Sequence, residues 1–149
     1  MKLITLFILS ILLNTSSFTA KVVRVIDGDT IVVLTENNQQ IKVRLEAIDC
    51  PESNQDFGYQ AKQATAKLCF NKEVRVKKTG EDKYGRTLAF VYVGEVCVNE
   101  ELLKQGMAWH YKYYNHDPGL ARLENEAREK KVGIWSLPNP VAPWDFRHK

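Results

Sequence analysis

Two β-rich runs joined by a tight turn are the feature that most constrains the fold of this chain. Residues 21–35 read K-V-V-R-V-I-D-G-D-T-I-V-V-L-T, so Asp-Gly-Asp separates two apolar runs. An Asp-Gly pair in this setting is typical of a hairpin or a β-bulge. The polar residues 37–39 mark a second turn, which leads into the alternating residues 40–46. The start of the chain therefore predicts a three-stranded meander.

The two acids of the first turn differ in how well the turn explains them. Asp27 suits the turn itself, because Asp side chains often bond nearby backbone groups. Asp29 stands beside Thr30 and Ile31 at the start of the next run, where an Asp disfavours β-structure. Asp29 is therefore a candidate functional residue.

A cation and two further acids lie at the end of the third predicted strand, in the stretch R-L-E-A-I-D-C-P-E from Arg44 to Glu52. Pro51 has no N–H to donate and ends the strand, so Asp49 and Glu52 fall where the chain turns. Loop carboxylates held by a rigid strand are a common way to build a metal or acid–base site. The alternative is that both acids are merely solvated at the strand end.

The rest of the chain predicts strands and helices in turn. Residues 58–70 carry small and apolar side chains at helical spacing, and residues 73–78 alternate Val with charged residues. Asn99 is expected to cap a short helix that Gly106 ends. The remaining predicted elements are a hairpin at residues 87–98 and helices at residues 100–105 and 118–131.

This order of elements fits a small closed Greek-key barrel of the OB type. We therefore predict an α+β fold, mainly a five-stranded β-barrel, with three helices. The Pro-rich residues 137–149 are expected to form an irregular arm that packs back on the body, with no function assigned to it.

Residues 1–20 have the three-part form of a secretory signal peptide, with Lys2 before an apolar core and a small polar end. The apolar core is shorter than the roughly 20 residues of a membrane span. Cleavage after Ala20 leaves Phe18 three residues back from the cleavage point, where signal peptidases prefer a small residue. Cleavage after Thr19 or Ser17 gives better pairs of small residues. We expect cleavage, an exported periplasmic or extracellular domain of residues 21–149, and no membrane association afterwards. An uncleaved anchor is the alternative.

Charge and cysteine content add two limits. The chain has 21 Lys and Arg against 18 Asp and Glu. Removing residues 1–20 removes Lys2 and no acid, which leaves 20 minus 18, or +2, too little to argue nucleic-acid binding by itself. Three Cys in an exported protein favour one disulfide and one free thiol. A Cys69–Cys97 bridge with Cys50 free is the prediction, and an all-reduced chain or another pairing is the alternative.

Several motifs occur together in a fixed order. They are I-D-G-D-T at 26–30, V-R-L-E-A-I-D-C-P-E at 43–52, D-K-Y-G-R at 82–86, V-N-E-E-L-L-K-Q-G-M-A at 98–108 and I-W-S at 134–136. In these blocks the chain resembles the staphylococcal nuclease (thermonuclease) family over essentially its whole mature length. The resemblance implies an OB barrel with helices and a calcium-dependent nuclease of both DNA and RNA. It implies cutting of the 5′ P–O bond to leave 3′-phosphate ends, and we expect a monomer.

The resemblance also implies a calcium site. The family's calcium ligands match Asp29, Asp49 and the backbone carbonyl of Cys50. Calcium prefers hard oxygen ligands, and a carbonyl ligand is indifferent to its own side chain. A thiolate ligand would favour zinc instead, so zinc held by Cys50 and a histidine is the alternative.

Three more positions match the family's catalytic residues. Glu52 matches the residue that activates or orients the attacking water. Arg44 and Arg86 match the two arginines that grip the phosphate, because a guanidinium fork fits two phosphate oxygens. The alternative for Arg86 is that it bonds backbone carbonyls and holds its loop together. Lys83 either adds positive potential near the phosphate or is a solvated loop lysine.

Tyrosines line the nucleotide pocket in this family, and the stretch W-H-Y-K-Y-Y at 109–114 supplies candidates. Tyr111 and Tyr113 are expected to contact base or sugar, with simple packing as the alternative. His110 and His116 are expected to face solvent rather than bind a metal. A domain of this fold that only binds nucleic acid or protein would lack the acids and arginines, and all of them are present here.

Overall fold

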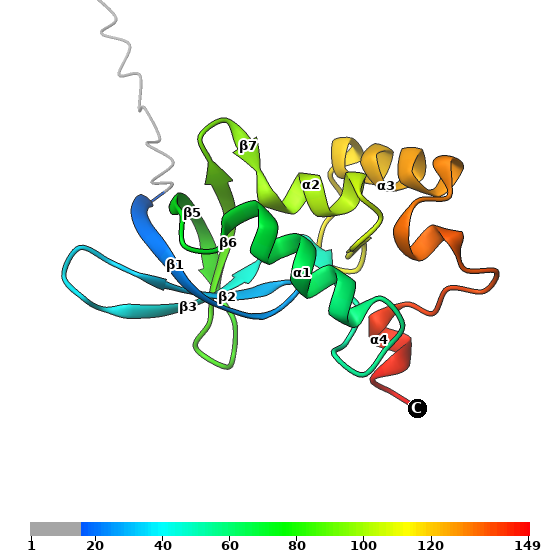
Figure 1. Cartoon of the computed structure of the whole chain (residues 1–149), viewed down its shortest axis with the longest axis horizontal. Coiled ribbons are helices and arrows are strands. Elements are labelled where there is room, and N and C mark those ends of the chain that lie inside the picture. Colours follow the sequence, from blue (N-terminus) through cyan, green and yellow to red (C-terminus); the bar gives the residue numbers. More distant parts are fainter. Residues whose placement is uncertain (1–15) are drawn as a thin grey trace, which may run out of the picture.

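A closed β-barrel forms the body of the computed structural model, which describes residues 16–149 (Figure 1). The strand order is β3-β2-β1-β5-β6-β7, and an additional pairing of β3 with β6 closes the sheet. The five-stranded OB-type barrel predicted from the sequence is confirmed. Its strands are β1 (Ser17–Asp27), β2 (Thr30–Leu34), β3 (Gln40–Leu45), β5 (Glu73–Glu81) and β6 (Thr87–Val93).

The closing pair of strands determines where the site forms. Strands β3 and β6 run parallel, with Arg44 opposite Leu88 and Val43 opposite Thr87. Arg86 directly precedes Thr87 at the start of β6. The parallel pairing therefore brings the two arginines to the same rim of the barrel.

Short strands and helices surround the barrel. Strand β4 (Ile48–Asp49) pairs with β8 (Trp109–His110), and β7 (Val96–Cys97) extends the β6 hairpin. The three predicted helices are present, with two short helical turns after them. No helix within residues 16–149 is both long and apolar enough to cross a membrane. The helices are α1 (Gly58–Cys69), α2 (Val98–Lys104), α3 (Pro118–Lys130), the 3₁₀ turn η1 (Gly133–Ser136) and α4 (Pro143–Phe146).

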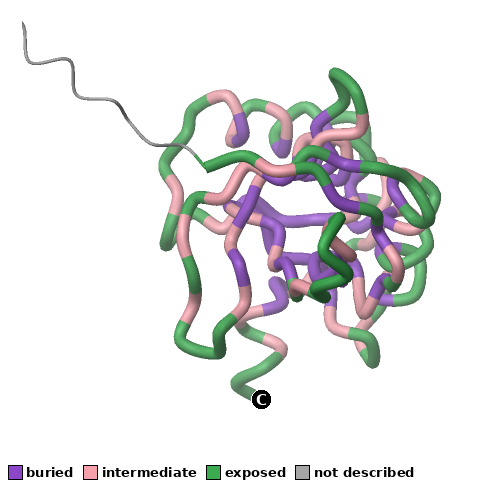
Figure 2. The backbone as a smooth tube through the Cα atoms, turned by 90° about the vertical axis from the view of Figure 1, so that its left-hand side faces the viewer, coloured by how far each residue is buried: buried purple, intermediate pink, exposed green. Residues whose placement is uncertain are grey.

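The core fills the barrel and continues under the helices. Figure 2 shows the buried segments gathered inside the molecule and the exposed ones in its outer loops. Val74 and Val76 of β5 are buried, and the charged residues that alternate with them face outward. A second apolar cluster around Trp109 and Trp135 holds the C-terminal part of the chain against the body. The C-terminal arm thus packs back on the body, as expected.

Strand β1 begins before the predicted start of the mature domain at Lys21. Ser17 pairs with Lys77 of β5, and the pairing continues through residues 18–20. Ala20 is buried and Phe18 packs against the core. Cleavage after Ala20 would therefore remove the first residues of a barrel strand. The remainder of the predicted leader, residues 1–15, lies outside the described residues.

The predicted Cys69–Cys97 bridge is wrong, because all three cysteines are free and buried. Cys69 ends α1, and its Sγ lies 3.2 Å from the Thr65 carbonyl within the same helix. Burial raises the pKa of the Cys69 thiol to about 12. The Cys97 Sγ instead lies 3.9 Å from Oδ1 of Asn99 at the junction of β7 and α2. The two thiols have different neighbours, and burial disfavours the thiolate that forms disulfides.

The prediction that Asn99 caps α2 is wrong. Asn99 is a buried residue inside that helix. Its Oδ1 accepts a hydrogen bond from the backbone N–H of Val91 at 3.1 Å. Its Nδ2 donates to the carbonyl oxygens of Glu46 at 2.9 Å and Ala89 at 3.2 Å. Asn99 therefore ties α2 to β6 and to the turn after β3.

Candidate active site

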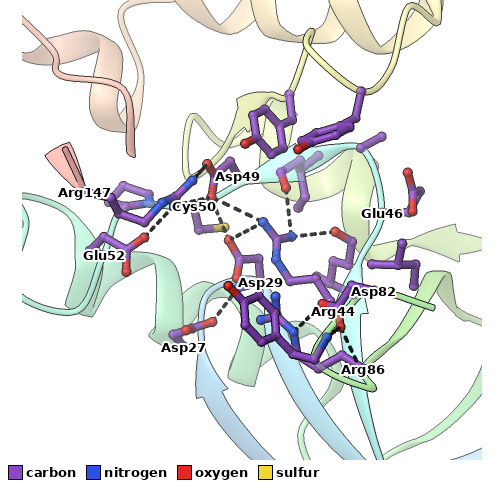
Figure 3. Close-up of a pocket in the computed structure, with 18 of the residues that line it drawn as sticks. Asp27, Asp29, Arg44, Glu46, Asp49, Cys50, Glu52, Asp82, Arg86 and Arg147 are labelled. Carbon is purple, nitrogen blue, oxygen red and sulfur yellow. Dashed lines mark hydrogen bonds and ion pairs between the residues drawn. The ribbon is translucent and has the colours of Figure 1, made fainter. Parts of the chain in front are cut away.

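A cavity of about 850 Å³ lies at the rim where β3 and β6 meet (Figure 3). It gathers every predicted site residue except Tyr113, which is 81% exposed and lies outside it. The polar and aromatic residues that line it are Asp27, Asp29, Arg44, Glu46, Asp49, Cys50, Glu52, Asp82, Lys83, Tyr84, Arg86, Tyr111, Tyr114 and Arg147.

Arg44 lies between the two acids that the sequence marks as cation ligands. Its Nη2 is 3.3 Å from Oδ2 of Asp29 and 3.3 Å from Oδ1 of Asp49. Its Nη1 donates to the carbonyl oxygens of Leu45 at 2.7 Å and Ile48 at 2.9 Å. Burial opposes the charged form of Arg44, but the two carboxylates outweigh it and raise the pKa. The guanidinium is therefore a fixed positive charge in a rigid frame.

The acids of the cavity are crowded and poorly solvated. Burial, followed by the neighbouring Asp29, raises the pKa of Asp27 to about 7. Burial raises the pKa of Asp49 to about 6, although a hydrogen bond from Arg147 opposes the rise. Oδ1 of Asp27 accepts the backbone N–H of Asp29 at 3.1 Å, which is the turn role predicted for Asp27. A divalent cation among these carboxylates would relieve their mutual repulsion.

The Asp-Gly-Asp turn is locked against the rest of the site. A Cβ atom at Gly28 would lie 2.8 Å from the Cβ of Cys50 and 2.9 Å from the Cβ of Ala61. Thr65 of α1 donates its hydroxyl to the Gly28 carbonyl. Oδ2 of Asp29 accepts the backbone N–H of Cys50 at 2.7 Å. Only glycine allows this close approach, which fixes the Asp29 carboxylate beside the Cys50 backbone.

Glu52 is positioned by the tight loop that precedes α1. Its backbone N–H donates to Oε1 of Gln55 at 3.1 Å, and the Gln55 N–H donates to the Glu52 carbonyl at 2.9 Å. A Cβ at Gly58 would lie 2.0 Å from the Glu52 carbonyl oxygen, so the loop closes this tightly only over a glycine. The Glu52 side chain is 33% exposed, within reach of solvent.

Arg86 is oriented by Asp82 across the turn D-K-Y-G-R. Oδ2 of Asp82 accepts from Nε of Arg86 at 2.6 Å, and Oδ1 accepts the Arg86 backbone N–H at 3.0 Å. Burial opposes ionisation of Asp82, but the hydrogen bonds from Arg86 outweigh it and lower the pKa. Gly85 turns the chain with a φ of +76°. The Arg86 side chain thus bonds a carboxylate, and not the backbone carbonyls of the alternative interpretation.

Aromatic side chains form the side of the cavity that faces the C-terminal arm. Tyr111 stacks on Trp144, with ring centroids 5.3 Å apart and planes 8° apart, and meets Tyr114 edge-on. Tyr114 and Tyr84 also line the cavity, and the sequence interpretation includes neither as a site residue. Tyr84 lies between Lys83 and Arg86 in the turn motif, and this place between two cations is the sequence signal that marks it.

The two histidines lie in different surroundings. His116 is exposed, as expected. His110 is buried in β8, and its Nε2 lies 2.8 Å from Oδ1 of Asn115, so the prediction that it faces solvent is wrong. The short pairing of β8 with β4 draws His110 inward.

Arg147 is the charged residue that the sequence interpretation missed. Its Nη1 lies 2.6 Å from Oε1 of Glu52, and its Nη2 lies 2.8 Å from Oδ2 of Asp49 (Figure 3). The hydrogen bond with Asp49 raises the pKa of Arg147. It follows a Pro-rich stretch and stands two residues from Lys149, so no local pattern marks it as a site residue.

The donor chemistry of the cavity suits a hard cation with few protein ligands. Asp29 and Asp49 both face Nη2 of Arg44, so their oxygens converge on one region. Within residues 16–149, no group of three or more His, Cys, Asp and Glu side chains is arranged to hold a metal. Burial and the neighbouring Asp29 raise the pKa of the Cys50 thiol well above its ordinary value, which disfavours a zinc thiolate. Two carboxylates with water suit a hard cation such as calcium better.

Comparison with known proteins agrees with this site. Residues 42–137 match the family model described as staphylococcal nuclease homologue. The chain is 44% identical over 131 residues to an uncharacterized endonuclease of Haemophilus influenzae. The matched region covers 88% of this chain and 74% of that protein. The chain is 44% identical over 143 residues to a micrococcal nuclease of Shigella flexneri, with 89% and 82% covered. An uncharacterized endonuclease of Escherichia coli O157:H7 is 41% identical over 147 residues, with 98% and 95% covered.

The OB barrel, with its acids and arginines gathered at one rim, defines the class of protein as a nuclease. The chain belongs to the staphylococcal nuclease family.

Proposed function

We propose that this protein is a calcium-dependent nuclease that hydrolyses phosphodiester bonds in both DNA and RNA. In this proposal it cuts the 5′ P–O bond and leaves 3′-phosphate ends. The observation that supports it best is the position of Arg44, between Asp29 and Asp49 in the cavity that Glu52 and Arg86 also line. A phosphate group that enters this cavity meets fixed guanidinium groups beside carboxylates suited to a cation.

Asp29, Asp49 and the backbone carbonyl of Cys50 would hold the calcium ion. When bound, the cation would supply positive charge to the phosphate oxygens and would make a bound water easier to deprotonate. Asp29 is held in place by the Cys50 N–H and by the Thr30 hydroxyl, which donates to its other oxygen at 3.2 Å. The chain thus fixes one ligand of the pair without help from the cation.

Glu52 orients the attacking water and takes its proton. Its carboxylate is part-exposed on a loop that Gln55 and Gly58 hold rigid, so it reaches solvent from a fixed position. A positioned carboxylate of this kind contributes about 10²–10⁴-fold to a rate through general base catalysis. Water can reach the Glu52 carboxylate directly, because Glu52 lines the cavity.

Arg44 and Arg86 bind the oxygens of the phosphate that is attacked. Nε of Arg86 is engaged by Asp82, which leaves its two Nη groups for the substrate. Negative charge builds on these oxygens as the phosphorus becomes five-coordinate, so both guanidinium groups bind more strongly in the transition state than in the ground state. Arg44 lies in β3 and Arg86 lies directly before β6, so the two guanidinium groups reach the phosphate from different segments of the same rim.

One wall of the cavity is cationic and aromatic and would contact the nucleotides that flank the cleaved bond. It is formed by Lys83, Tyr84, Tyr111 and Tyr114. Stacking on tyrosine rings tolerates every base, which suits a substrate range that includes DNA and RNA. Tyr113 is exposed next to Tyr114, with ring centroids 4.8 Å apart, and would contact only a longer strand. Export through the predicted leader and action as a monomer belong to the same proposal.

The test uses the purified protein on single-stranded DNA, duplex DNA and RNA, with added calcium or with excess chelator. Product ends are identified by whether a 3′-phosphatase is needed before they accept a new nucleotide. The proposal predicts cleavage of all three substrates in calcium only, with 3′-phosphate ends. Products with 5′-phosphate ends, or tight binding of nucleic acid without cleavage, would contradict it.

A further inference from the structure

The last residues of the chain reach into the active site from outside the barrel. Trp144 of α4 stacks on Tyr111 and meets Trp109 edge-on at 5.5 Å between ring centroids. Nε2 of Gln55 donates to the Val141 carbonyl at 2.6 Å, which ties the same arm to the Glu52 loop. These contacts aim the Arg147 side chain at the carboxylates (Figure 3).

Arg147 occupies both oxygens of Asp49 and one of Glu52. Its Nη2 is 2.8 Å from Oδ2 of Asp49, and its Nη1 is 3.2 Å from Oδ1 of the same residue. The same Nη1 donates to Oε1 of Glu52 at 2.6 Å. The side-chain carboxylate of Asp29, in contrast, contacts only Thr30, Cys50 and Arg44 among the described residues. Arg147 thus contacts Asp49, one of the two acids expected to bind the cation, and Glu52, the acid expected to orient the water.

A guanidinium and a metal ion compete for the same lone pairs. A cation at Asp49 needs at least one of its two oxygens, and both now accept from Arg147. Two positive charges on one buried carboxylate also repel each other in a poorly solvated site. Arg147 is 38% exposed and follows a helix of only four residues, so its side chain can leave without disrupting the barrel.

We propose that Arg147 is a positioning residue that holds Asp49 and Glu52 in the cation-free protein, and that it must leave Asp49 before a divalent cation can bind there. This inference rests on the proposed function, in which Asp49 is a cation ligand. Its consequence is that the C-terminal arm lowers the affinity of the site for the cation. Removal of the guanidinium should then tighten cation binding in the absence of nucleic acid.

The experiment measures the dissociation constant of calcium by titration calorimetry, without nucleic acid, for the wild type and two variants. Arg147→Gln removes the guanidinium. Lys149→Gln is the matched control, because it removes one positive charge from the same arm at a residue that lines a separate cavity. We expect Arg147→Gln to bind calcium roughly tenfold more tightly than the wild type, equivalent to about 1.4 kcal/mol. Lys149→Gln should stay within about twofold, because exposed charges are largely screened.

A third variant, Arg147→Lys, keeps the charge but loses the fork that spans both oxygens, and should bind calcium with intermediate affinity. The inference is overturned if the wild type binds calcium and Arg147→Gln binds it no more tightly, or more weakly. Failure of all four proteins to bind calcium would overturn the calcium site of the proposed function as well. Melting curves in chelator identify any variant that is unfolded. If Arg147→Gln is unfolded, the calcium affinity of Arg147→Lys, the milder change, is compared with that of the wild type instead.

Discussion

Nε of Arg86 lies 2.6 Å from Oδ2 of Asp82, and the backbone N–H of Arg86 donates to the other oxygen of the same carboxylate. The acid therefore sets the direction of the guanidinium before any substrate arrives. Such prior orientation lowers the cost of binding a phosphate in the geometry of the transition state.

The first prediction separates charge from geometry at this residue. Arg86→Lys keeps one positive charge but loses both the planar fork and the bond to Asp82. Turnover should fall by about two to four orders of magnitude, or about 3–5 kcal/mol of barrier. Substrate affinity should change much less, because the interaction is strongest in the transition state. Steady-state kinetics with a melting curve test this, and a folded variant with near wild-type turnover would show that Arg86 has no catalytic role.

The second prediction concerns the loop that carries Glu52. Gly58→Ala places a Cβ about 2.0 Å from the Glu52 carbonyl oxygen unless the loop shifts. We expect a loss of about 1–3 kcal/mol of stability from this overpacking, and at least roughly tenfold lower turnover as Glu52 moves. Gly80→Ala is the control, because a Cβ at Gly80 meets nothing within 4 Å. Equal activity of the two variants would contradict the assigned position of Glu52.

The third prediction is a pH dependence of stability in the absence of calcium. The pKa values of Asp27 and Asp49 are raised in the folded protein, to about 7 and about 6, from the ordinary value of 3.8. Between those values the folded protein binds more protons than the unfolded chain, so the free energy of unfolding falls as pH rises. The melting temperature in chelator should therefore drop from about pH 5 to about pH 8, where both acids are charged.

Asp27→Asn provides the control for this pH dependence. The amide keeps an oxygen that can accept the Asp29 N–H but does not titrate, so the drop in melting temperature should be smaller than in the wild type. A wild-type protein whose melting temperature rises steadily over the same range would show that the buried acids are not the source.

The fourth prediction concerns the start of the folded domain. A chain that begins at Lys21 loses the pairing of residues 17–20 with β5, the burial of Ala20 and the packing of Phe18. It should be less stable than a chain that begins at Ser17 by about 2 kcal/mol or more. Denaturant unfolding of the two proteins measures the difference. Equal stability would mean that the first residues of β1 contribute nothing to the barrel.

The parts of the fold that the sequence predicts correctly are those with local causes. The Asp-Gly-Asp turn and the alternation of Val74 and Val76 each follow from a few neighbouring residues. Asn99 looks like a helix cap by the same local rules, but it is buried because its amide is hydrogen-bonded to β6 and to the turn after β3. Contacts of that kind depend on the closed barrel and leave no local pattern.

The site divides in the same way. Asp29, Arg44, Asp49, Glu52 and Arg86 lie in short motifs, and the closure of β3 on β6 brings them to one cavity. Arg147 has no motif, and its place depends on the packing of Trp144 against Tyr111. The absence of the Cys69–Cys97 bridge likewise follows from how each thiol is buried, which spacing alone does not reveal.

The proposed cation site is tested by measuring phosphodiester hydrolysis against calcium concentration for the wild type, Asp49→Asn and Asp56→Asn. Asp49 is 1% exposed beside Arg44, whereas Asp56 is exposed and outside the catalytic cavity. Wild-type activity should rise with calcium and vanish in excess chelator, Asp56→Asn should behave in the same way, and a folded Asp49→Asn should lose most of its activity. Full wild-type activity in excess chelator, or an Asp49→Asn protein as active as Asp56→Asn, would contradict the cation site on which the proposal rests.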